Sequence, residues 1–464
     1  MNRTVTHLAS LLLAACFFTS QQASSQTISG GINFSISVCN NNSAMSWGYN
    51  GEGQLGDSTH TSRTAPVQVN GLTGVIAVSS GGAHTLALKN DGTVWAWGYN
   101  VYSSLGIGTP GGDRDAPMQV AGISGIIAIS AGGYHSLALK SDGTVWSWGS
   151  NFAGEIGDGT ISTRATPVQV TGISGIVAIS AGSIHSMALK SDGTLYAWGF
   201  NADGRIGDGT TTNRFSPVVV GISNVTKIAA GGWHSLAVKS DGTVWSWGKN
   251  ADGQLGDGTT TEQHTPVQIP GLSGISLLRA GEFHSLALKT DGTLWAWGKN
   301  GSGQLGDGTT VSKSSPVQVT GISGGINAIA CGMEHSLALK NDGTLWGWGA
   351  NSSSQLSDGT TADKTTPVQV TGLCAALVAG IGNVENNSGF NVYPNPSSGS
   401  VILELPVVKN ITISVMSITG QEVYSEITNG GKVELNLDGL SAGMYILRFS
   451  SEESGGAKRL IIQK

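Results

Sequence analysis

Short runs of alternating apolar and polar side chains dominate this chain. In the run from His135 to Lys140 (HSLALK), Leu137 and Leu139 fall on one side, which is the periodicity of a strand with one covered face. An Asp-Gly turn follows, and residues 145–149 (VWSWG) alternate again. An Asp-Gly pair between two such runs is the strongest short hairpin signal, and it favours positive φ at both turn positions. The pattern therefore predicts a β-hairpin over residues 135–149.

The same hairpin pattern returns along most of the chain with a nearly constant period. The closing Trp-Gly pairs are 49 to 51 residues apart, and their tryptophans are Trp47, Trp97, Trp148, Trp198, Trp247, Trp297 and Trp348. Between hairpins lie a glycine-rich loop, such as GQLGDGT at 253–259, a run that begins with proline at Pro266, and an apolar run such as 125–129. Four short strands per repeat are typical of a propeller blade, because one such unit cannot bury its own apolar face. We therefore predict an all-β protein with a seven-bladed β-propeller over residues 26–380.

Four motifs of the repeat resemble those of the regulator-of-chromosome-condensation family of seven-bladed β-propellers. They are HSLALK-x-DGT, W-x-WG-x-N, GQLGDGT and PVQV, and the resemblance covers about residues 29–380. The resemblance implies the fold. The eukaryotic namesake of the family exchanges guanine nucleotides on a small GTPase, which it engages with a β-hairpin wedge inserted in a blade. Repeats of 49 to 51 residues leave no room for such an insertion, so a guanine-nucleotide-exchange-like regulator is a less favoured function.

The first and last repeats differ from the others, as terminal repeats usually do. Phe34 stands where the other units have a histidine, and the last unit ends in the apolar run 372–378. We expect this run to share one blade with the segment 28–38. Such sharing would close the ring and remove exposed strand edges.

Residues 1–25 have the pattern of a secretory signal peptide. Arg3 precedes an apolar stretch over residues 8–18, and Ala23-Ser24-Ser25 forms a small-residue cleavage site. Two alternatives stay open, namely a buried N-terminal helix and lipidation of Cys16, whose LAAC context resembles a bacterial lipobox.

Cysteine spacing and charge exclude several classes of protein. After cleavage Cys39, Cys331 and Cys374 remain; a bridge from Cys374 to either of the others would fit the ring closure, but we expect three buried thiols. No CxxC spacing supports a zinc site, and we expect no metal or other cofactor. A formal charge of −6 without basic clusters argues against nucleic acid as a partner. No apolar run reaches the length of a transmembrane segment.

The C-terminal part has a different composition. A Gly- and Asn-rich linker over residues 381–390 leads into residues 391–464, where four alternating runs predict a small Ig-like β-sandwich. This part resembles the type A C-terminal sorting domain of the type IX secretion system of Bacteroidota. The matching residues are Tyr393, Pro394, Asn395, Pro396, Gly420, Gly443, Tyr445, Lys458, Arg459 and Lys464. The resemblance implies engagement of the type IX machinery, passage through the outer membrane of a Gram-negative cell, removal of the tail, and release or surface attachment.

Two polar positions recur in the repeat. Six histidines open the hairpins, namely His84, His135, His185, His234, His284 and His335. One interpretation is a ring of metal or anion ligands, but we expect each to satisfy a backbone group inside its own blade, because one residue per blade does not converge on a metal. Six loop aspartates are Asp57, Asp158, Asp208, Asp257, Asp307 and Asp358, and six residues after each stands Arg63, Arg164, Arg214, Gln263, Lys313 or Lys364. This offset predicts an ion pair between the carboxylate and the cation within each loop, which we call a clasp. We favour it over calcium binding, because calcium requires several oxygen ligands and each loop supplies a single carboxylate. In the second unit Ile107 replaces the aspartate, and Asp113 or Asp115 is expected to substitute.

Positions that vary within the constant repeat are the candidate binding site. Before the histidines stand, among others, Tyr134, Ile184, Trp233 and Phe283, and after the Trp-Gly pairs stand Tyr49, Tyr99 and Phe200. Variable, often aromatic loop positions suggest a recognition surface, although they could equally fill gaps between blades. Because no unique residues form a catalytic motif, we predict no enzyme but a secreted or cell-surface propeller that binds a protein or a glycan. The alternative is a secreted hydrolase or lyase with its site at the central opening.

Overall fold

The computed structural model describes residues 27–374 and, in the C-terminal part, 391–393, 400–405, 411–417, 422–429, 431–440, 443–450 and 455–462. The chain divides into two compact units, Met1–Ala379 and Gly380–Lys464, and each is described by itself. The expected signal peptide, Cys16 and the expected linker lie outside the described residues.

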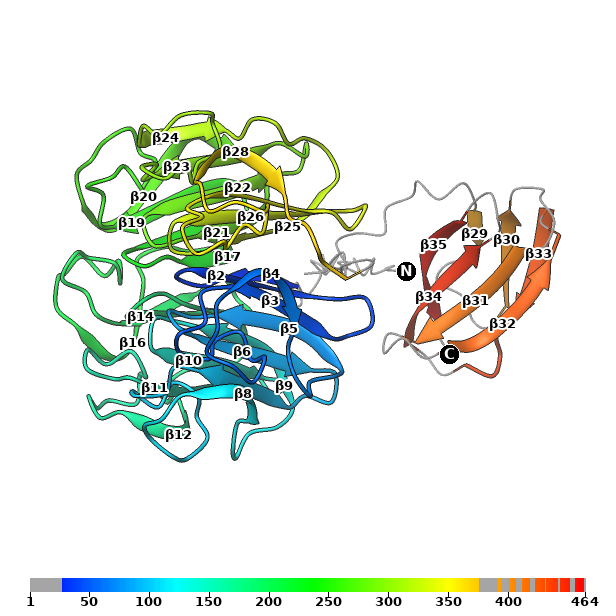
Figure 1. Ribbon diagram of the computed structural model, residues 1–464, viewed down its shortest axis with the longest axis horizontal. Coiled ribbons are helices and arrows are strands. Elements are labelled where there is room, and N and C mark those ends of the chain that lie inside the picture. The colour runs from blue at the N-terminus through cyan, green and yellow to red at the C-terminus, as the bar shows by residue number, and fades with distance from the viewer. Residues whose placement is uncertain are drawn as a thin grey trace, which may run out of the picture. The chain divides into compact units, whose positions relative to one another are not determined.

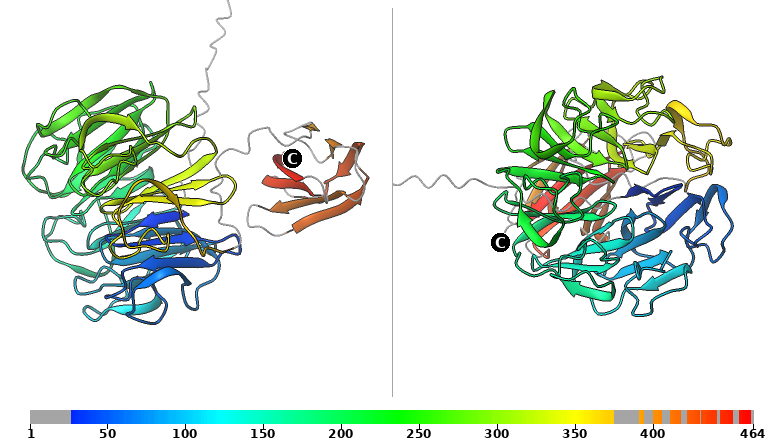
Figure 2. Two further views of the ribbon diagram at one scale, coloured as in Figure 1. Left: turned by 45° about the horizontal axis from the view of Figure 1, so that its top comes forward. Right: turned by 90° about the vertical axis from the view of Figure 1, so that its left-hand side faces the viewer.

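The first unit is a ring of seven four-stranded antiparallel sheets (Figure 1), which the right-hand view of Figure 2 shows arranged around a common centre. The prediction of seven blades is confirmed. The strand bounds, blade by blade, are β1 Ile28–Gly30, β2 Phe34–Val38, β3 Ala44–Gly48 and β4 Arg63–Gln68; β5 Val75–Ser80, β6 His84–Lys89, β7 Val94–Gly98 and β8 Arg114–Gln119; β9 Ile126–Ala131, β10 His135–Lys140, β11 Val145–Gly149 and β12 Arg164–Gln169; β13 Ile176–Ala181, β14 His185–Lys190, β15 Leu195–Gly199 and β16 Arg214–Val219; β17 Val225–Ala230, β18 His234–Lys239, β19 Thr243–Gly248 and β20 Gln263–Ser273; β21 Ile275–Ala280, β22 His284–Lys289, β23 Leu294–Gly298 and β24 Lys313–Gln318; β25 Ile326–Cys331, β26 His335–Lys340, β27 Leu345–Gly349 and β28 Lys364–Gln369.

The predicted hairpin is present in every blade, but its turn differs from the expected one. In the third blade His135 pairs with Gly149 and Leu139 pairs with Val145. Gly143 has a φ of 80° whereas Asp142 is not among the residues with positive φ, so only one turn position is left-handed. The Asp142 carboxylate accepts hydrogen bonds from the Thr144 backbone N–H (3.0 Å) and hydroxyl (2.6 Å). The turn is therefore a three-residue loop that ends in a left-handed glycine, and the aspartate acts through its side chain.

The two ends of the repeat region were expected to share a blade, but within the described residues the first blade contains no strand from the end of that region. The first sheet has the order β1-β2-β3-β4, so all four of its strands come from residues 28–68. In each blade the apolar run is the first strand of its own sheet, and β1 fills that place in the first blade. Residues 375–378, the larger part of the run 372–378, lie outside the described residues.

A disulfide joins the last blade to the first instead. Cys39 follows β2 and Cys374 follows β28, and the bond spans 335 residues with a Cα–Cα distance of 6.1 Å. Ile28 and Trp47 of the first blade pack in one apolar cluster with Leu337 of the last blade and with both bridging cysteines. The expectation of three thiols is thus wrong, because ring closure brings two of them together; Cys331 is the free cysteine of the described chain.

At each seam one backbone carbonyl of a blade accepts two hydrogen bonds from the next blade. Between the third and fourth blades the Glu155 carbonyl accepts hydrogen bonds from the Trp198 indole N–H and the Ser186 hydroxyl, both at 2.9 Å. The same fork occurs at all seven seams, and the accepting carbonyls belong to Gln54, Ser104, Glu155, Arg205, Gln254, Gln304 and Gln355. The seven repeat tryptophans are completely buried, so each supplies both apolar packing and one inter-blade hydrogen bond.

The six repeated histidines also act across the seams, not inside their own blades as expected. His135 Nε2 lies 2.9 Å from the Ser186 hydroxyl of the next blade, and the other five distances are 2.8 to 3.0 Å. Because the serine donates its hydrogen to the carbonyl, it accepts the histidine Nε2–H, which fixes the tautomer. The six Nδ1 atoms are buried without a hydrogen-bond partner, so a proton there would have no acceptor. At the remaining seam Phe34 takes the place of the histidine and Thr85 the place of the serine, and the Thr85 hydroxyl donates to the Gln54 carbonyl at 3.0 Å.

The second unit consists of two antiparallel sheets, β29-β30-β33 and β32-β31-β34-β35. Their strands are β29 Asn391–Tyr393, β30 Ser400–Leu405, β31 Ile411–Ser417, β32 Glu422–Thr428, β33 Gly431–Asn436, β34 Gly443–Ser450 and β35 Gly455–Ile462. Both sheets contribute to one buried core, for example Leu403 and Leu435 from one and Ile413 and Leu447 from the other. The prediction of a small β-sandwich is confirmed.

Candidate functional site

Backbone hydrogen bonds bring the two variable positions of each blade together. The residue after the Trp-Gly pair donates its N–H to the carbonyl of the residue before the histidine, as Ser150 does to Tyr134 (3.0 Å) and Phe200 to Ile184 (2.9 Å). The pairs lie at the open end of each hairpin, opposite the Asp-Gly turns. We call this side of the ring the loop face; its predicted binding residues are Tyr49, Tyr99, Tyr134, Ile184, Phe200, Trp233 and Phe283.

Side chains of the second and third blades form a first aromatic group, the tyrosine cluster. Tyr99, Tyr102, Tyr134 and Phe152 have ring centroids 5.3 to 6.0 Å apart. Phe152 is 65% exposed and Tyr134 37% exposed. Beside them a hollow of about 350 Å³ is lined by Ile184 and Phe200 of the fourth blade, among others. Large apolar side chains exposed together in this way are typical of a recognition site.

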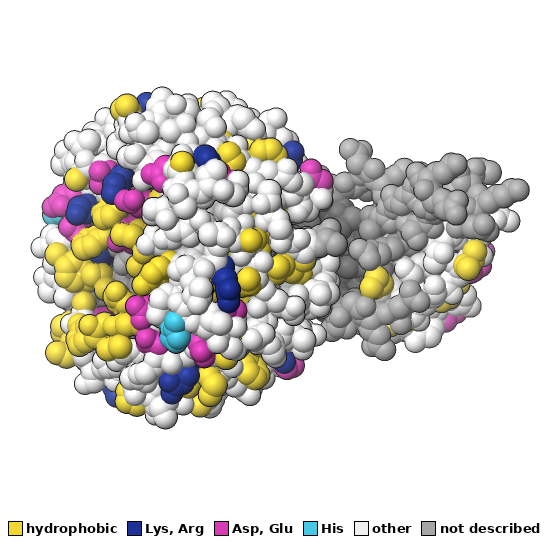
Figure 3. Space-filling view, viewed as in Figure 1, with side chains coloured by type: hydrophobic (Ala, Val, Ile, Leu, Met, Phe, Trp, Pro, Cys, Tyr) yellow, Lys and Arg dark blue, Asp and Glu magenta, His cyan; other side chains and the backbone are white. Residues whose placement is uncertain are grey.

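A second group, the tryptophan cluster, combines rings with cations. Trp233 and Phe283 are stacked with centroids 6.1 Å apart and planes 8° from parallel. Lys249 Nζ lies 4.8 Å from the Trp233 ring centroid, and Lys299 Nζ lies 5.4 Å from that of Phe283. Arg205, which is fully buried, places its guanidinium 4.4 Å from the Trp233 ring. Figure 3 shows hydrophobic side chains gathered on the propeller with basic and acidic side chains around them.

The sequence analysis missed three of these residues. Tyr102 stands four places and Phe152 three places after the glycine of the Trp-Gly pair, beyond the variable position that directly follows that glycine. Arg205 replaces the glutamine of the GQLG motif, whose side chain in other blades folds back on the loop; Gln54 Oε1, for instance, accepts the Glu52 N–H at 2.9 Å. A residue that departs from an otherwise constant motif, as Arg205 does, is the feature of the sequence that could have identified this position. Tyr49, by contrast, is exposed, and within the described residues it has no ring contact with either cluster.

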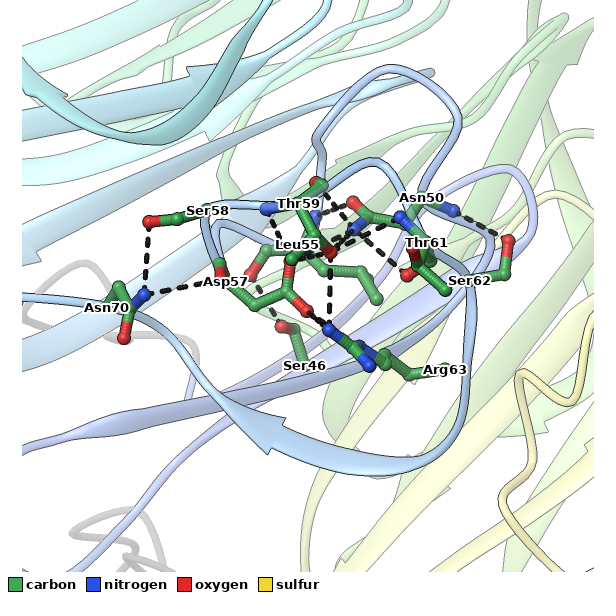
Figure 4. Close-up of polar contacts among 10 residues, drawn as sticks. All are labelled: Ser46, Asn50, Leu55, Asp57, Ser58, Thr59, Thr61, Ser62, Arg63 and Asn70. Carbon is green, nitrogen blue, oxygen red and sulfur yellow. Dashed lines mark hydrogen bonds and ion pairs between the residues drawn. The ribbon is translucent and has the colours of Figure 1, made fainter.

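The loops beneath the loop face are held by the predicted clasps (Figure 4). The Asp57 carboxylate accepts two hydrogen bonds from Thr59 and pairs with Arg63, whose Nε and Nη2 are both 2.6 Å from Oδ2. Asn50, the asparagine of W-x-WG-x-N, donates from its amide to the same carboxylate at 3.1 Å. Burial raises the pKa of the Asp57 carboxyl, but the hydrogen bonds from Thr59 and Arg63 outweigh it and lower that pKa overall.

Five of the six predicted clasps are ion pairs, with the charged partners Arg63, Arg164, Arg214, Lys313 and Lys364. The sixth aspartate, Asp257, stands opposite neutral Gln263. In the second blade Asp113 accepts the Asn100 backbone N–H at 3.0 Å, and Arg114 donates to the carbonyls of Gly112 and Asp113.

Removing one clasp is expected to have a small, separable effect on stability. We expect Asp208→Asn to lower the free energy of unfolding by about 1–2 kcal/mol, because charge-assisted hydrogen bonds to Thr210 and Arg214 are lost. Asp257→Asn is the matched control, since its loop lacks the cation. The difference between the two, measured by urea unfolding, should equal the ion-pair contribution of about 0–1 kcal/mol. A larger loss in Asp257→Asn than in Asp208→Asn would contradict this account.

The central opening has a different lining. Its cavity of about 790 Å³ contains one carboxylate among the described lining residues, Asp192, which pairs with Lys190 at 2.6 Å. Among the described residues no group of three or more His, Cys, Asp or Glu side chains is placed to hold a metal ion. The described chain contains no helix with the length and apolar character of a membrane span.

A closed ring of seven repeat-built blades with a variable loop face defines the β-propeller class of repeat proteins. More narrowly, the chain belongs to the RCC1-like domain family, whose model matches residues 11–225 and 212–386. Residues 391–463 match the secretion system C-terminal sorting domain. Together they define an RCC1-like propeller followed by a type IX sorting tail, and a tail of this kind indicates export through that machinery.

Curated relatives match over part of their length only. The chain is 33% identical to the human probable E3 ubiquitin-protein ligase HERC6 over 134 residues, which are 28% of this chain and 13% of the relative. It is 31% identical to the ultraviolet-B receptor UVR8 of Arabidopsis thaliana over 137 residues, which are 28% of this chain and 31% of the receptor. The match thus spans less than a third of each of these relatives.

Solved structures show the same fold. Human WBSCR16 superposes with a TM-score of 0.64 at 24% identity, over 71% of this chain and 94% of that one. Prp20p of Saccharomyces cerevisiae gives a TM-score of 0.64 at 24% identity, over 74% of this chain and 86% of that one.

The sorting-signal residues are only partly within the described chain. Tyr393 ends β29, Gly443 begins β34, Tyr445 packs against the sandwich core, and Lys458 and Arg459 lie in β35. The remaining five, Pro394, Asn395, Pro396, Gly420 and Lys464, lie outside the described residues.

Proposed function

We propose that this protein is an exported, non-enzymatic propeller that binds an extracellular protein or glycan with the aromatic side chains of its loop face. The observation that carries the proposal is the contrast between a constant framework and a variable loop face. The tryptophans, histidines, serines and carbonyls of the seams repeat from blade to blade, whereas the two variable positions differ between blades and include the exposed Tyr49 and Tyr134 and the half-buried Tyr99, Phe200, Trp233 and Phe283. Rings placed on a rigid scaffold contribute large contact area at little conformational cost.

The two clusters favour ligands with a polar and an apolar side. Stacked rings such as Trp233 and Phe283 suit the apolar face of a sugar or a side chain of a protein. Lys249 lies over the Trp233 ring and adds donors and positive charge, while Lys299, which lies over the Phe283 ring, is paired with Glu334 at 2.5 Å. The rings of the tyrosine cluster, on the second and third blades, provide a second contact area.

Export places such a partner outside the cell. The sorting tail supports secretion or attachment to the outer surface of a Gram-negative, Bacteroidota-like cell, and the N-terminal signal-peptide pattern agrees with it. The Cys39–Cys374 disulfide supports the same location, because such bonds persist in oxidising compartments and are rare in the cytosol.

Substitution of the tryptophan cluster is expected to abolish most partner binding. The full-length protein, immobilised, should retain a ligand from cell envelopes or a glycan array, and Trp233→Ala with Phe283→Ala should weaken retention at least about 10-fold, since central aromatic anchors carry most binding energy. Trp245→Ala is the matched control: Trp245 lies on β19, where its indole N–H donates to Thr243 of the same strand at 2.9 Å. Retention by the double variant equal to that by Trp245→Ala would reject the loop face as the binding site.

A further inference from the structure

The hollow beside the tyrosine cluster is bounded largely by aromatic rings. The plane of Tyr102 lies at 89° to that of Phe152 and at 70° to that of Tyr134, and the ring centroids are 5.3 Å apart in both pairs. Phe200 of the fourth blade also lines this hollow of about 350 Å³. Rings in different orientations therefore surround one small volume, and the faces of such rings attract cations.

The one charged side chain in the described lining of the hollow is a buried carboxylate. Glu155 is 1% exposed; its Oε1 accepts the Ser150 hydroxyl at 2.6 Å and its Oε2 accepts the Ala153 N–H at 2.8 Å. In the described part of the chain it belongs to no ion pair. Four other blades have a neutral glutamine at the same position, namely Gln54, Gln254, Gln304 and Gln355. The fold thus does not need this charge, and burying it without a cation costs free energy that a positively charged ligand would offset.

Two more carboxylates act on the opposite side of the tyrosine cluster. Burial raises the pKa of the Tyr99 hydroxyl, and the neighbouring Tyr102, Tyr134, Asp113 and Glu52 raise it further. Asp113 and Glu52 therefore lie close enough to the rings to add to the negative charge that Glu155 supplies from the other side.

A basic side chain lies nearby, but its charge is balanced. The Arg205 guanidinium is 4.7 Å from the Phe200 ring centroid, and it is ion-paired with Asp203. Arg205 is not among the described residues that line the hollow. It therefore leaves the charge of Glu155 available to a ligand.

We propose that this hollow binds a quaternary ammonium group, such as the trimethylammonium head of choline. The rings and the Glu155 carboxylate attract its charge, and its methyl groups pack against the rings. A primary ammonium or a guanidinium would bring several N–H donors that need acceptors, whereas each Glu155 oxygen already accepts a hydrogen bond. A quaternary group carries no donor, so an aromatic wall suits it better. The volume of about 350 Å³ matches the lower end of small-molecule sites.

The test is isothermal titration of the full-length protein with three small ligands. They are choline, its uncharged carbon analogue dimethylbutanol, and ethanolamine, which carries a primary ammonium. We expect choline to bind at least about 10-fold more tightly than either of the others. No binding of choline, or equal affinity for choline and dimethylbutanol, would overturn the proposal. Ethanolamine binding as tightly as choline would overturn the assignment of a quaternary group.

Variants that copy other blades separate charge from shape. Glu155→Gln restores the glutamine of four blades, so the ring should fold; we expect it to weaken choline binding at least about 5-fold and to leave dimethylbutanol binding unchanged, because only the charge is removed. Tyr102→Ala/Phe152→Ala copies Ala153 and Ala202 of other blades and should weaken the binding of both ligands. Choline affinity that is unchanged in either folded variant would contradict the proposed site.

Glu334→Gln is the control, because it removes a carboxylate of the last blade that is paired with Lys299. It should leave choline affinity unchanged; a loss as large as that of Glu155→Gln would show that the overall charge, not the hollow, attracts the ligand. The proposal names a ligand for one part of the loop face and in that respect rests on the proposed function, but the two can fail separately. Specific choline binding without partner capture through Trp233 and Phe283 would reject only the proposed function, and the reverse result would reject only the ammonium site.

Discussion

Lowering the pH from 7 to 5 is expected to remove most of the free energy of unfolding of the propeller. Burial lowers the pKa of His84, His135, His234 and His284 to about 3 and that of His335 to about 4; it also lowers the pKa of His185. In the unfolded chain a histidine titrates near pH 6.5. Between these pKa values the histidines of the unfolded state therefore bind protons, whereas those of the folded state stay neutral.

The sign and size of this effect follow from proton linkage. A folded pKa below the unfolded one means that stability is fully present above about pH 6.5 and falls as the pH drops towards the folded pKa. Each histidine costs about 1.4 kcal/mol per pH unit in that window, or roughly 2 kcal/mol by pH 5. Six such groups together cost on the order of 10 kcal/mol, which is comparable with the whole stability of a typical domain. We therefore expect an acid midpoint near pH 5.

The measurement is the free energy of unfolding at pH 7, 6 and 5, followed by tryptophan fluorescence in urea. The double variant His135→Phe/Ser186→Thr copies the natural Phe34–Thr85 seam, and it should reduce the pH dependence by about one sixth. The clasp aspartates do not contribute to the pH dependence between pH 7 and 5. Their pKa values are lowered, so their contribution to the free energy of unfolding is lost only below about pH 4. A free energy of unfolding that is the same at pH 7 and pH 5 would contradict the neutral-imidazole seams.

Removal of the closing disulfide is expected to have the second large effect. The bond joins residues 335 positions apart, and in the chain-entropy model a loop of that length is worth about 6 kcal/mol. Measured losses are commonly about 2–5 kcal/mol. We expect Cys39→Ala/Cys374→Ala to lose about 3–5 kcal/mol, and a reductant to lower the unfolding midpoint of the wild type but not that of the variant.

Cys331→Ala is the control for this experiment. Its position on β25 matches Ala131, Ala181, Ala230 and Ala280 of other blades, so the substitution copies a residue that the fold already accepts. Its midpoint should stay close to that of the wild type and should remain sensitive to reductant. A double variant as stable as Cys331→Ala would show that apolar packing around Ile28 and Leu337 closes the ring without the covalent bond.

Features that depend on neighbours along the chain follow directly from the amino-acid sequence. Alternation in HSLALK and VWSWG, with the Asp-Gly turn between them, specifies a hairpin, because strand period and turn chemistry are local properties. The repeat of Trp148 and its six counterparts specifies the number of blades. The six-residue offset between Asp57 and Arg63 specified the clasp for the same reason, since both groups lie in one loop.

Contacts between residues of different blades, by contrast, follow from the three-dimensional packing of the ring. His135 reaches Ser186, Cys39 reaches Cys374, and Tyr102 packs on Phe152, because closing the ring places the edge of one blade against the next. The position of each of these groups depends on the angle between blades, which no local pattern encodes. The same closure turns Lys227 and Arg279, two separate departures from the repeat, into neighbours in one channel. A period in the sequence shows that units are copied, but contacts between different copies arise only when the copies are packed around one axis.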